Sequence, residues 1–109
     1  MSEIDEITAE LLKFRNERDW EQFHNPKDLA IGLSIEANEL LEVFLWKAYN
    51  EADKERVKEE LADVFGYAFL MAEKYGFDVK QIILDKIKAN ALKYPVDKAK
   101  GNATKYDQL

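Results

Sequence analysis

The sequence predicts an all-α protein whose protomer is similar to a four-helix bundle. Apolar residues recur at the three- to four-residue period of an α-helix along nearly the whole chain, and no segment shows the alternation of a half-buried β-strand. Helix-capping residues, glycine and proline stand at the ends of these periodic segments. Because 109 residues suit one small domain, we expect a single domain over residues 1–109.

The N-terminal half is expected to contain two helices joined by a loop. The first helix covers about residues 2–17 and begins with a serine N-cap. The segment RDWEQFHN interrupts the apolar period and is expected to be a loop. Asn25 followed by Pro26 is the pattern of an N-cap and a first helical residue, so the second helix is expected over residues 26–48.

Two further helices and a tail are expected in the C-terminal half. The third helix covers about residues 53–75, and Gly76 suits the left-handed position that ends many helices. The fourth helix opens with Asp78 as its cap and a glutamine three residues later, and it stops near Tyr94. Residues 95–109 are polar and basic, and we expect them to form an irregular tail.

Charge and composition exclude several classes of function. The chain has 16 basic and 22 acidic residues, a net charge of −6, which argues against a nucleic-acid polymer as partner. The charge is uneven, because residues 1–85 carry a net −10 and residues 86–109 a net +4. There is no cysteine to form a disulfide, and neither a signal peptide nor a membrane-spanning apolar run is recognisable. We therefore expect a soluble, cytoplasmic protein without a membrane partner.

The second predicted helix carries acidic residues in an apolar setting. Glu36, Glu39 and Glu42 are three residues apart and therefore neighbours on one side of the helix. No lysine or arginine occurs over residues 28–46 to neutralise them, and the helix is apolar nearly all round, which is typical of a buried helix. We expect Glu36 and Glu39 to be buried or to line a cleft. Glu42 is expected either at the rim of that cleft or as a hydrogen-bond acceptor next to Glu36 and Glu39.

The third predicted helix repeats the pattern with Glu60 and Asp63, and Tyr67 follows one turn later on the same side. Two carboxylate pairs that converge from adjacent helices would repel each other at a high desolvation cost unless a cation joined them. Carboxylate oxygens suit Mg²⁺, with Mn²⁺ as a substitute. The alternative is that the acids of both helices are ordinary surface residues paired with lysines. A di-iron centre is disfavoured because His24, the one histidine, is not part of an ExxH ligand pattern.

The chain resembles the MazG-type all-α nucleoside triphosphate pyrophosphohydrolases. The resemblance is carried by ExxE on one helix and ExxD on the next, with a short polar turn between them. The closer likeness is to the dCTP pyrophosphatase branch, in the segments RDWEQFHNPKDL, LLEVFLW, EELADVFGY and KYP, and it covers about residues 11–106.

This resemblance implies a Mg²⁺-dependent enzyme that hydrolyses a nucleoside triphosphate, such as dCTP or a modified pyrimidine nucleotide, to the monophosphate and pyrophosphate. Such an enzyme would clear unwanted nucleotides from the pool. The implied catalytic metal ligands are Glu36, Glu39, Glu60 and Asp63. The implied base pocket consists of Trp20, Glu21, Gln22, Phe23, His24 and Trp46, with Tyr67 contacting the substrate. Family sites lie between subunits, which implies a homodimer or a homotetramer.

On the fourth helix, Lys86 and Asn90 lie one turn apart, with Lys93 and Tyr94 beyond them, and we expect these four to bind the triphosphate. One departure concerns Leu11, which stands where better-known relatives place a histidine that touches the substrate, so the preferred base stays open.

We hypothesise in-line attack of water on the α-phosphorus, with Glu39 orienting or deprotonating the water. The alternatives are a nucleotide-binding or regulatory helical module without turnover, and a purely structural bundle.

Overall fold

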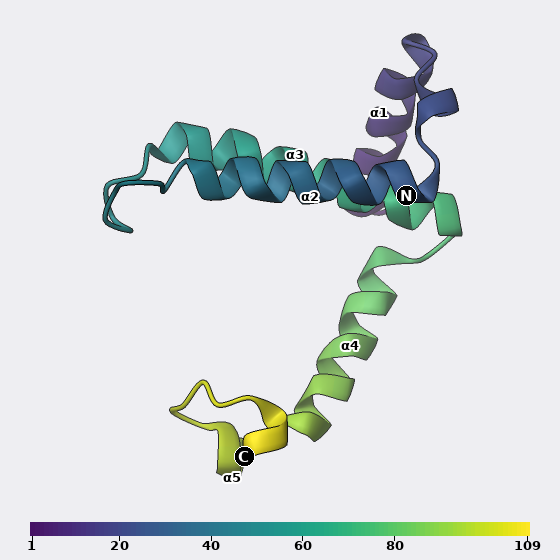
Figure 1. Cartoon of the computed structure of the whole chain (residues 1–109). Helices are drawn as coiled ribbons and strands as arrows, with labels where there is room; N and C mark the ends of the chain where they lie inside the picture. The colour runs from purple at the N-terminus through teal and green to yellow at the C-terminus, as the bar shows by residue number, and fades with distance from the viewer. The chain divides into compact units, whose positions relative to one another are not determined.

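The chain is helical and contains no β-strand, so the prediction of an all-α protein is confirmed (Figure 1). The computed structural model describes every residue from Met1 to Leu109, and these form two compact units, Met1–Phe77 and Asp78–Leu109. The first unit contains α1 (Glu3–Glu17), η1 (Glu21–Phe23), α2 (Pro26–Glu42) and α3 (Lys54–Tyr75). The second contains α4 (Val79–Lys93), α5 (Val96–Ala99) and η2 (Tyr106–Gln108). None of these helices has the length and apolar character needed to cross a membrane.

The helix starts follow from the capping residues in the sequence. Ser2 and Asp5 form a reciprocal capping box on α1, in which each side chain accepts a hydrogen bond from the backbone N–H of the other. The Asn25 side chain accepts from the backbone of the third helical residue of α2, at 2.9 Å. Asp53 and Asp78 cap α3 and α4 in the same manner. These predicted starts are therefore confirmed.

In the first unit, α2 and α3 lie side by side, with the loop between them at one end and α1 at the other (Figure 1). Residues 43–53 connect the two helices and reverse the direction of the chain between them. The apolar residues buried most completely are Leu29 and Val43, at the two ends of α2, and Leu70 and Ala72 late in α3. α3 also packs against α1, so it is the central helix of this unit.

The second helix ends earlier than predicted. It was expected to reach Ala48, but α2 ends at Glu42. From Val43 onward the backbone N–H groups bond to carbonyls three residues back, and the turn ends at Trp46, whose φ of 65° is left-handed. The Val43 side chain is completely buried, and this packing holds the tighter turn. Tertiary packing thus overrides the helical period of the sequence.

The C-terminal segment is more ordered than predicted. α4 stops at Lys93 as expected, but the residues after Pro95 form α5 and η2 within a segment that was predicted to be irregular. Proline has a fixed φ, here −57°, that suits a residue immediately before a helix. The Tyr106 ring packs edge-on against Tyr94, with ring centroids 6.0 Å apart, and this contact orders the tail.

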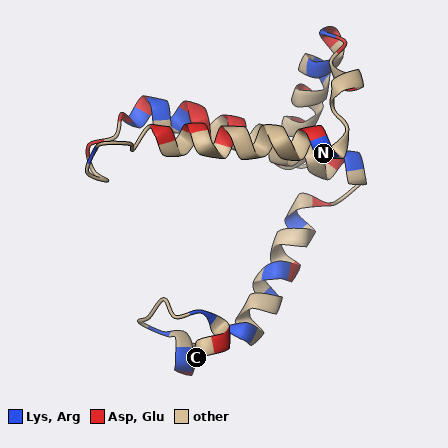
Figure 2. Cartoon of the chain, viewed as in Figure 1, with Lys and Arg blue, Asp and Glu red and all other residues tan.

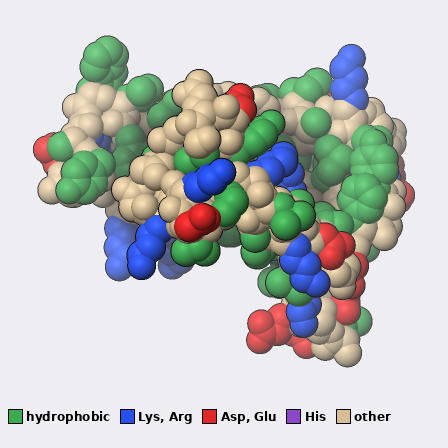
Figure 3. Space-filling model, turned by 90° about the horizontal axis from the view of Figure 1, so that it is seen from below, with side chains coloured by type: hydrophobic (Ala, Val, Ile, Leu, Met, Phe, Trp, Pro, Cys, Tyr) green, Lys and Arg blue, Asp and Glu red, His purple; other side chains and the backbone are tan.

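Large apolar side chains remain exposed in both units, and Figure 3 shows them gathered in groups at the surface. On α4 the exposed set consists of Ile82, Ile83, Leu84, Ile87 and Leu92. In the first unit it includes Ile31, Ile35, Leu41, Leu45, Leu61 and Phe65. Such contiguous apolar surface is typical of protein–protein contacts.

Two glycines inside helices provide a matched pair for a stability test. A Cβ at Gly32 would overlap the ring of Tyr67, whereas a Cβ at Gly66 would meet the Leu11 side chain at an ordinary 3.7 Å. Gly32→Ala should therefore destabilise the chain by about 1–3 kcal/mol through overpacking. Gly66→Ala should stabilise it by about 0.5–1 kcal/mol, because glycine is a poor helix former. Urea unfolding of both variants checks this, and equal effects would show that Tyr67 can move aside freely.

Candidate active site

The predicted acid pairs face each other across the α2–α3 contact. Each of Glu36, Glu60 and Asp63 offers one carboxylate oxygen, and these oxygens all lie within 4.8 Å of one another. Glu36 and Glu60 are half-buried, while Asp63 is exposed. One turn along α2, Glu39 interacts with both Glu36 and Glu60. The structure thus brings together all four predicted ligands, because each pair spans one turn of its own helix.

Burial and the like charges of its neighbours both make the ionised form of this cluster unfavourable. The pKa of Glu36 is raised to about 7, chiefly by burial and then by a hydrogen bond with Glu39 and the negative charges of Glu39, Asp63 and Glu60. Burial and the charge of Glu39 likewise raise the pKa of Glu60, although Arg56 partly opposes this. One oxygen of Glu36 and one of Glu60 are buried without a hydrogen-bond partner. A cation or a proton donor placed between these oxygens would satisfy them.

Beside the acids lies a cavity of about 280 Å³. Two of the metal-ligand candidates, Glu36 and Asp63, form part of its wall together with Tyr67. The opposite side comes from α1 and the loop after it. The residues there are Leu11, Phe14, Arg15, Trp20 and His24, and Ala62, Gly66 and Leu70 complete the lining.

The aromatic side chains of the cavity are held by local contacts. Phe14 and Trp20 pack edge to face with ring centroids 5.7 Å apart, and the Arg18 guanidinium lies 3.8 Å from the centre of the Phe14 ring. The Tyr67 ring fits against α2 because Gly32 has no side chain there. A flat ring that enters the cavity would therefore meet aromatic surfaces.

His24 is a neutral polar residue in the wall of the cavity. Burial lowers its pKa, and the nearby charges of Arg15 and Lys74 lower it further, so the imidazole is uncharged at neutral pH. Its Nδ1 atom is buried and has no hydrogen-bond partner. A ligand with a complementary polar edge would satisfy that atom.

The other residues predicted for base binding lie elsewhere. Glu21, Gln22 and Phe23 form the 3₁₀ turn η1 and do not line the cavity. The Glu21 carboxylate is paired with Arg15 and Lys74, and the Gln22 amide donates to Asp19. Trp46 follows the end of α2 and is 99% exposed. A role for these four in binding stays a prediction.

The four predicted triphosphate ligands on α4 belong to the second unit. Lys86 and Asn90 are exposed, and Lys93 extends over the ring of Tyr106, with Nζ 4.8 Å from the ring centre. Tyr94 packs against the same ring. Basic residues recur along α4, whereas acidic residues are frequent on α2 and α3 (Figure 2). The role of the α4 residues also stays a prediction.

Sequence reasoning missed several cavity residues. Phe14 and Arg15 were not among the predicted site residues, although one signal for Arg15 was available. It follows Leu11 by one helical turn, so it is a charged residue within the apolar stripe of α1. A cation at such a position is expected to be buried with partners.

Comparison with known proteins identifies the family of the chain. A model of the MazG-like family matches residues 31–109. The chain belongs to the MazG-like family. It is 38% identical to dCTP pyrophosphatase 1 of Mus musculus over 97% of this chain and 67% of that protein. The match to dCTP pyrophosphatase 1 of Bos taurus is 35% identical, over 97% of this chain and 68% of that protein.

A solved structure has the same fold. The crystal structure of a pyrophosphatase from Archaeoglobus fulgidus superposes with a TM-score of 0.81 and 33% sequence identity, covering 87% of this chain and 94% of that one. The predicted reaction class of this MazG-like chain, a nucleoside triphosphate pyrophosphohydrolase, is confirmed by these relatives.

The raised pKa of Glu36 predicts how stability depends on pH without metal. Because the folded chain holds the Glu36 proton more tightly than the unfolded chain, this stabilisation is present below pH about 4.5 and is lost as pH rises through about 7. Glu36→Gln should therefore be more stable relative to wild type at about pH 8 than at about pH 5. Urea unfolding with a chelator present measures this.

The control for that test is Glu59→Gln, which removes an exposed carboxylate next to the cluster. Its effect should be the same at both pH values. If the stability of Glu36→Gln relative to wild type is also the same at both pH values, the raised pKa of Glu36 is contradicted.

Proposed function

We propose that this MazG-like enzyme is a Mg²⁺-dependent pyrophosphohydrolase that converts a pyrimidine deoxynucleoside triphosphate, dCTP or a modified form of it, to the monophosphate and pyrophosphate. The observation that carries the proposal is the meeting of two acid pairs beside a cavity lined by Trp20, His24 and Tyr67. Clearing such nucleotides from the pool would be its role.

The acid cluster fits a divalent cation. Two buried carboxylate oxygens without partners, on Glu36 and Glu60, are groups that a cation would satisfy. The donor set consists of oxygen atoms alone, which suits Mg²⁺ or Mn²⁺ better than softer metals. Glu36, Glu39, Glu60 and Asp63 would hold the ion, and metal binding would displace the proton that Glu36 retains near neutral pH.

The reaction we propose is attack of water on the α-phosphorus, in line with the leaving pyrophosphate. Mg²⁺, when bound, neutralises phosphate oxygens and lowers the pKa of water. Glu39 lies within the acid cluster, and we assign it the task of orienting the attacking water and accepting its proton. Lys86 and Lys93 of α4 would neutralise phosphate oxygens that the metal leaves uncovered.

The cavity would hold the nucleobase. Aromatic side chains stack on a base with about 1–3 kcal/mol each, and Trp20 and Tyr67 supply such rings. Stacking does not choose between bases, so selectivity requires a polar group, and the neutral His24 with its unpaired Nδ1 is the candidate. Leu11 adds an apolar patch to the wall. We choose dCTP as the substrate because the chain is similar to dCTP pyrophosphatases.

Removing one member of the acid cluster tests the site. Glu39→Ala and Asp63→Ala should each lower kcat at least about 100-fold, because general-base and metal-ligand groups commonly contribute 10² or more. Asp63→Ala should also reduce the rise in Tm that Mg²⁺ causes in the wild type. Glu59→Gln is the control and should keep wild-type kinetics. Wild-type rates in both alanine variants would refute the assignment.

The products identify the bond that is cleaved. A panel of natural and modified nucleoside triphosphates with Mg²⁺ should yield monophosphate and pyrophosphate, with the highest kcat/KM for a cytosine nucleotide. In H₂¹⁸O the label should enter the monophosphate. Diphosphate and phosphate as products would place the attack at the γ-phosphorus. Binding without any product would favour a regulatory module.

The exposed apolar surface supports assembly into a homodimer or homotetramer. Trp46 is 99% exposed in one chain, which is a high cost for so large an apolar side chain unless a second copy covers it. We propose that Trp46 of one copy completes the base pocket of the other. In light scattering the mass should be two or four times 12.7 kDa.

Shared sites make a specific prediction for mixed assemblies. Trp46→Ala should raise KM by about tenfold or more through lost stacking. When this variant is co-expressed with inactive Glu39→Ala, mixed dimers would contain one site with both defects and one site with neither. Activity at low substrate should therefore exceed that of either variant alone. If it does not, Trp46 and Glu39 do not act in sites shared between copies.

A further inference from the structure

Arg15 is the one polar or charged residue of the chain that is classed as buried, at 5% exposure. A guanidinium removed from water is costly unless its charge and its N–H groups find partners. The residue lies on the side of α1 that faces α3, and it also lines the cavity beside the acids. Its burial next to the proposed base pocket requires an explanation.

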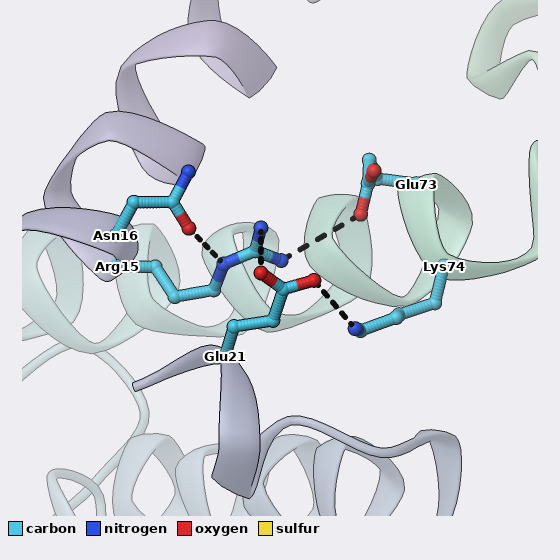
Figure 4. A network of polar contacts seen from close by, with 5 residues as sticks. All are labelled: Arg15, Asn16, Glu21, Glu73 and Lys74. Atoms are coloured by element: carbon cyan, nitrogen blue, oxygen red, sulfur yellow. Dashed lines mark hydrogen bonds and ion pairs between the residues drawn. The ribbon is translucent and has the colours of Figure 1, made fainter. Parts of the chain in front are cut away.

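The partners of Arg15 come from three different elements (Figure 4). Its Nε donates to the Asn16 side chain of α1 at 3.1 Å. One terminal nitrogen lies 3.7 Å from a Glu21 oxygen on η1, and the other lies 3.7 Å from a Glu73 oxygen on α3. The planar fork of an arginine can reach two carboxylates at once, which the single point charge of a lysine cannot do equally well.

Glu21 is held from two sides. Its second oxygen lies 3.6 Å from the ammonium group of Lys74 on α3, so the carboxylate sits between two cations (Figure 4). Exposed ion pairs contribute little singly, and the Glu21 side chain is 59% exposed. The pairs share members, however, so the buried guanidinium joins α1, η1 and α3 into one network.

The turn η1, which this network fixes, is flanked by two residues that line the cavity. Trp20 immediately precedes η1, and His24 immediately follows it. The backbone N–H of Trp20 donates to the Arg15 carbonyl at 3.0 Å, and the backbone N–H of His24 donates to the Glu21 carbonyl at 3.0 Å. The burial of apolar side chains contributes little to holding residues 20–24 in place, because Trp20 is 43% and Phe23 61% exposed. The polar network therefore supplies a large part of its anchoring.

We propose that Arg15 is a positioning residue for base binding, which anchors η1 to α3 through Glu21 and so holds Trp20 and His24 in place against the substrate base. This inference rests on the proposed function, because it assigns the cavity to a base. It also reassigns Glu21 from a substrate contact to a link between Arg15 and the turn. Arg15 itself takes no part in the chemistry at the acid cluster.

The kinetic experiment compares Arg15→Met, Arg15→Lys and Glu21→Gln with wild type, using dCTP and Mg²⁺. Arg15→Met should raise KM about tenfold with kcat changed less than about twofold, because the acid cluster is intact. Arg15→Lys should restore part of the loss, and Glu21→Gln should raise KM several-fold. The double variant Arg15→Met with Glu21→Gln should lose less than the sum of the two single effects, since both remove the Arg15–Glu21 link.

The matched control is Glu55→Gln, which breaks an exposed ion pair of 3.5 Å with Lys58 on α3 and should leave KM unchanged. A purely structural role of Arg15 predicts the opposite split, in which kcat falls with the folded fraction and KM stays constant. That result would overturn the proposal, as would additive effects in the double variant. If Arg15→Met does not fold, Glu21→Gln alone decides between the two roles.

A second measurement needs no turnover and separates this proposal from the proposed function. The chain has two tryptophans, so in a Trp46→Phe background the fluorescence comes from Trp20. Arg15→Met and Glu21→Gln should each increase acrylamide quenching of Trp20 at least twofold in the free protein, and Glu55→Gln should not. Unchanged quenching would overturn the anchoring role even if the enzyme is active. Increased quenching in a chain without pyrophosphohydrolase activity would refute the proposed function alone.

Discussion

The repulsion among four carboxylates at the α2–α3 contact is the constraint on which the site depends. The two helices pack against each other, yet Glu36 and Glu60 each hold a buried oxygen that no hydrogen bond satisfies. Burial, together with the charges of the neighbouring acids, raises the pKa of both, so their ionised forms are costly in the folded chain. A protein that only needed a stable helix pair would gain from apolar residues here. The arrangement is understandable as a cation site kept at some cost to stability.

Under the proposed function, the part of the cavity that would hold the base depends on a different kind of interaction. The acid pairs are positioned by two long helices, whereas Trp20 and His24 lie on a short turn whose conformation no long helix dictates. Asp19, which opens this turn, has a positive φ of 53°, a conformation that aspartate tolerates better than most residues. The buried guanidinium then ties the turn to α1 and α3. Under the proposed function, this separate anchoring of the acid cluster and of the base pocket would allow the base preference to change without disturbing the chemistry.

The sequence predicted the parts of this fold that are governed by local rules. Ser2, Asn25, Asp53 and Asp78 cap their helices by hydrogen bonds within three residues, so their roles are visible in the chain alone. The acid pairs were equally visible, because a spacing of three on a helix fixes their common side. The early end of α2 depends instead on the complete burial of Val43 by tertiary packing. Arg15 was missed for a similar reason, since its partners on η1 and α3 are distant in sequence.

The distribution of charge limits how a triphosphate can reach this site. Residues 1–77 carry nine basic and 18 acidic side chains, a net of −9, while residues 78–109 carry a net of +3. A polyanionic nucleotide is repelled by the first unit unless part of its charge is neutralised beforehand. Association as a complex with Mg²⁺ lowers that repulsion and also delivers a cation to the unsatisfied oxygens of Glu36 and Glu60. Under the proposed function, metal and nucleotide therefore favour each other's binding.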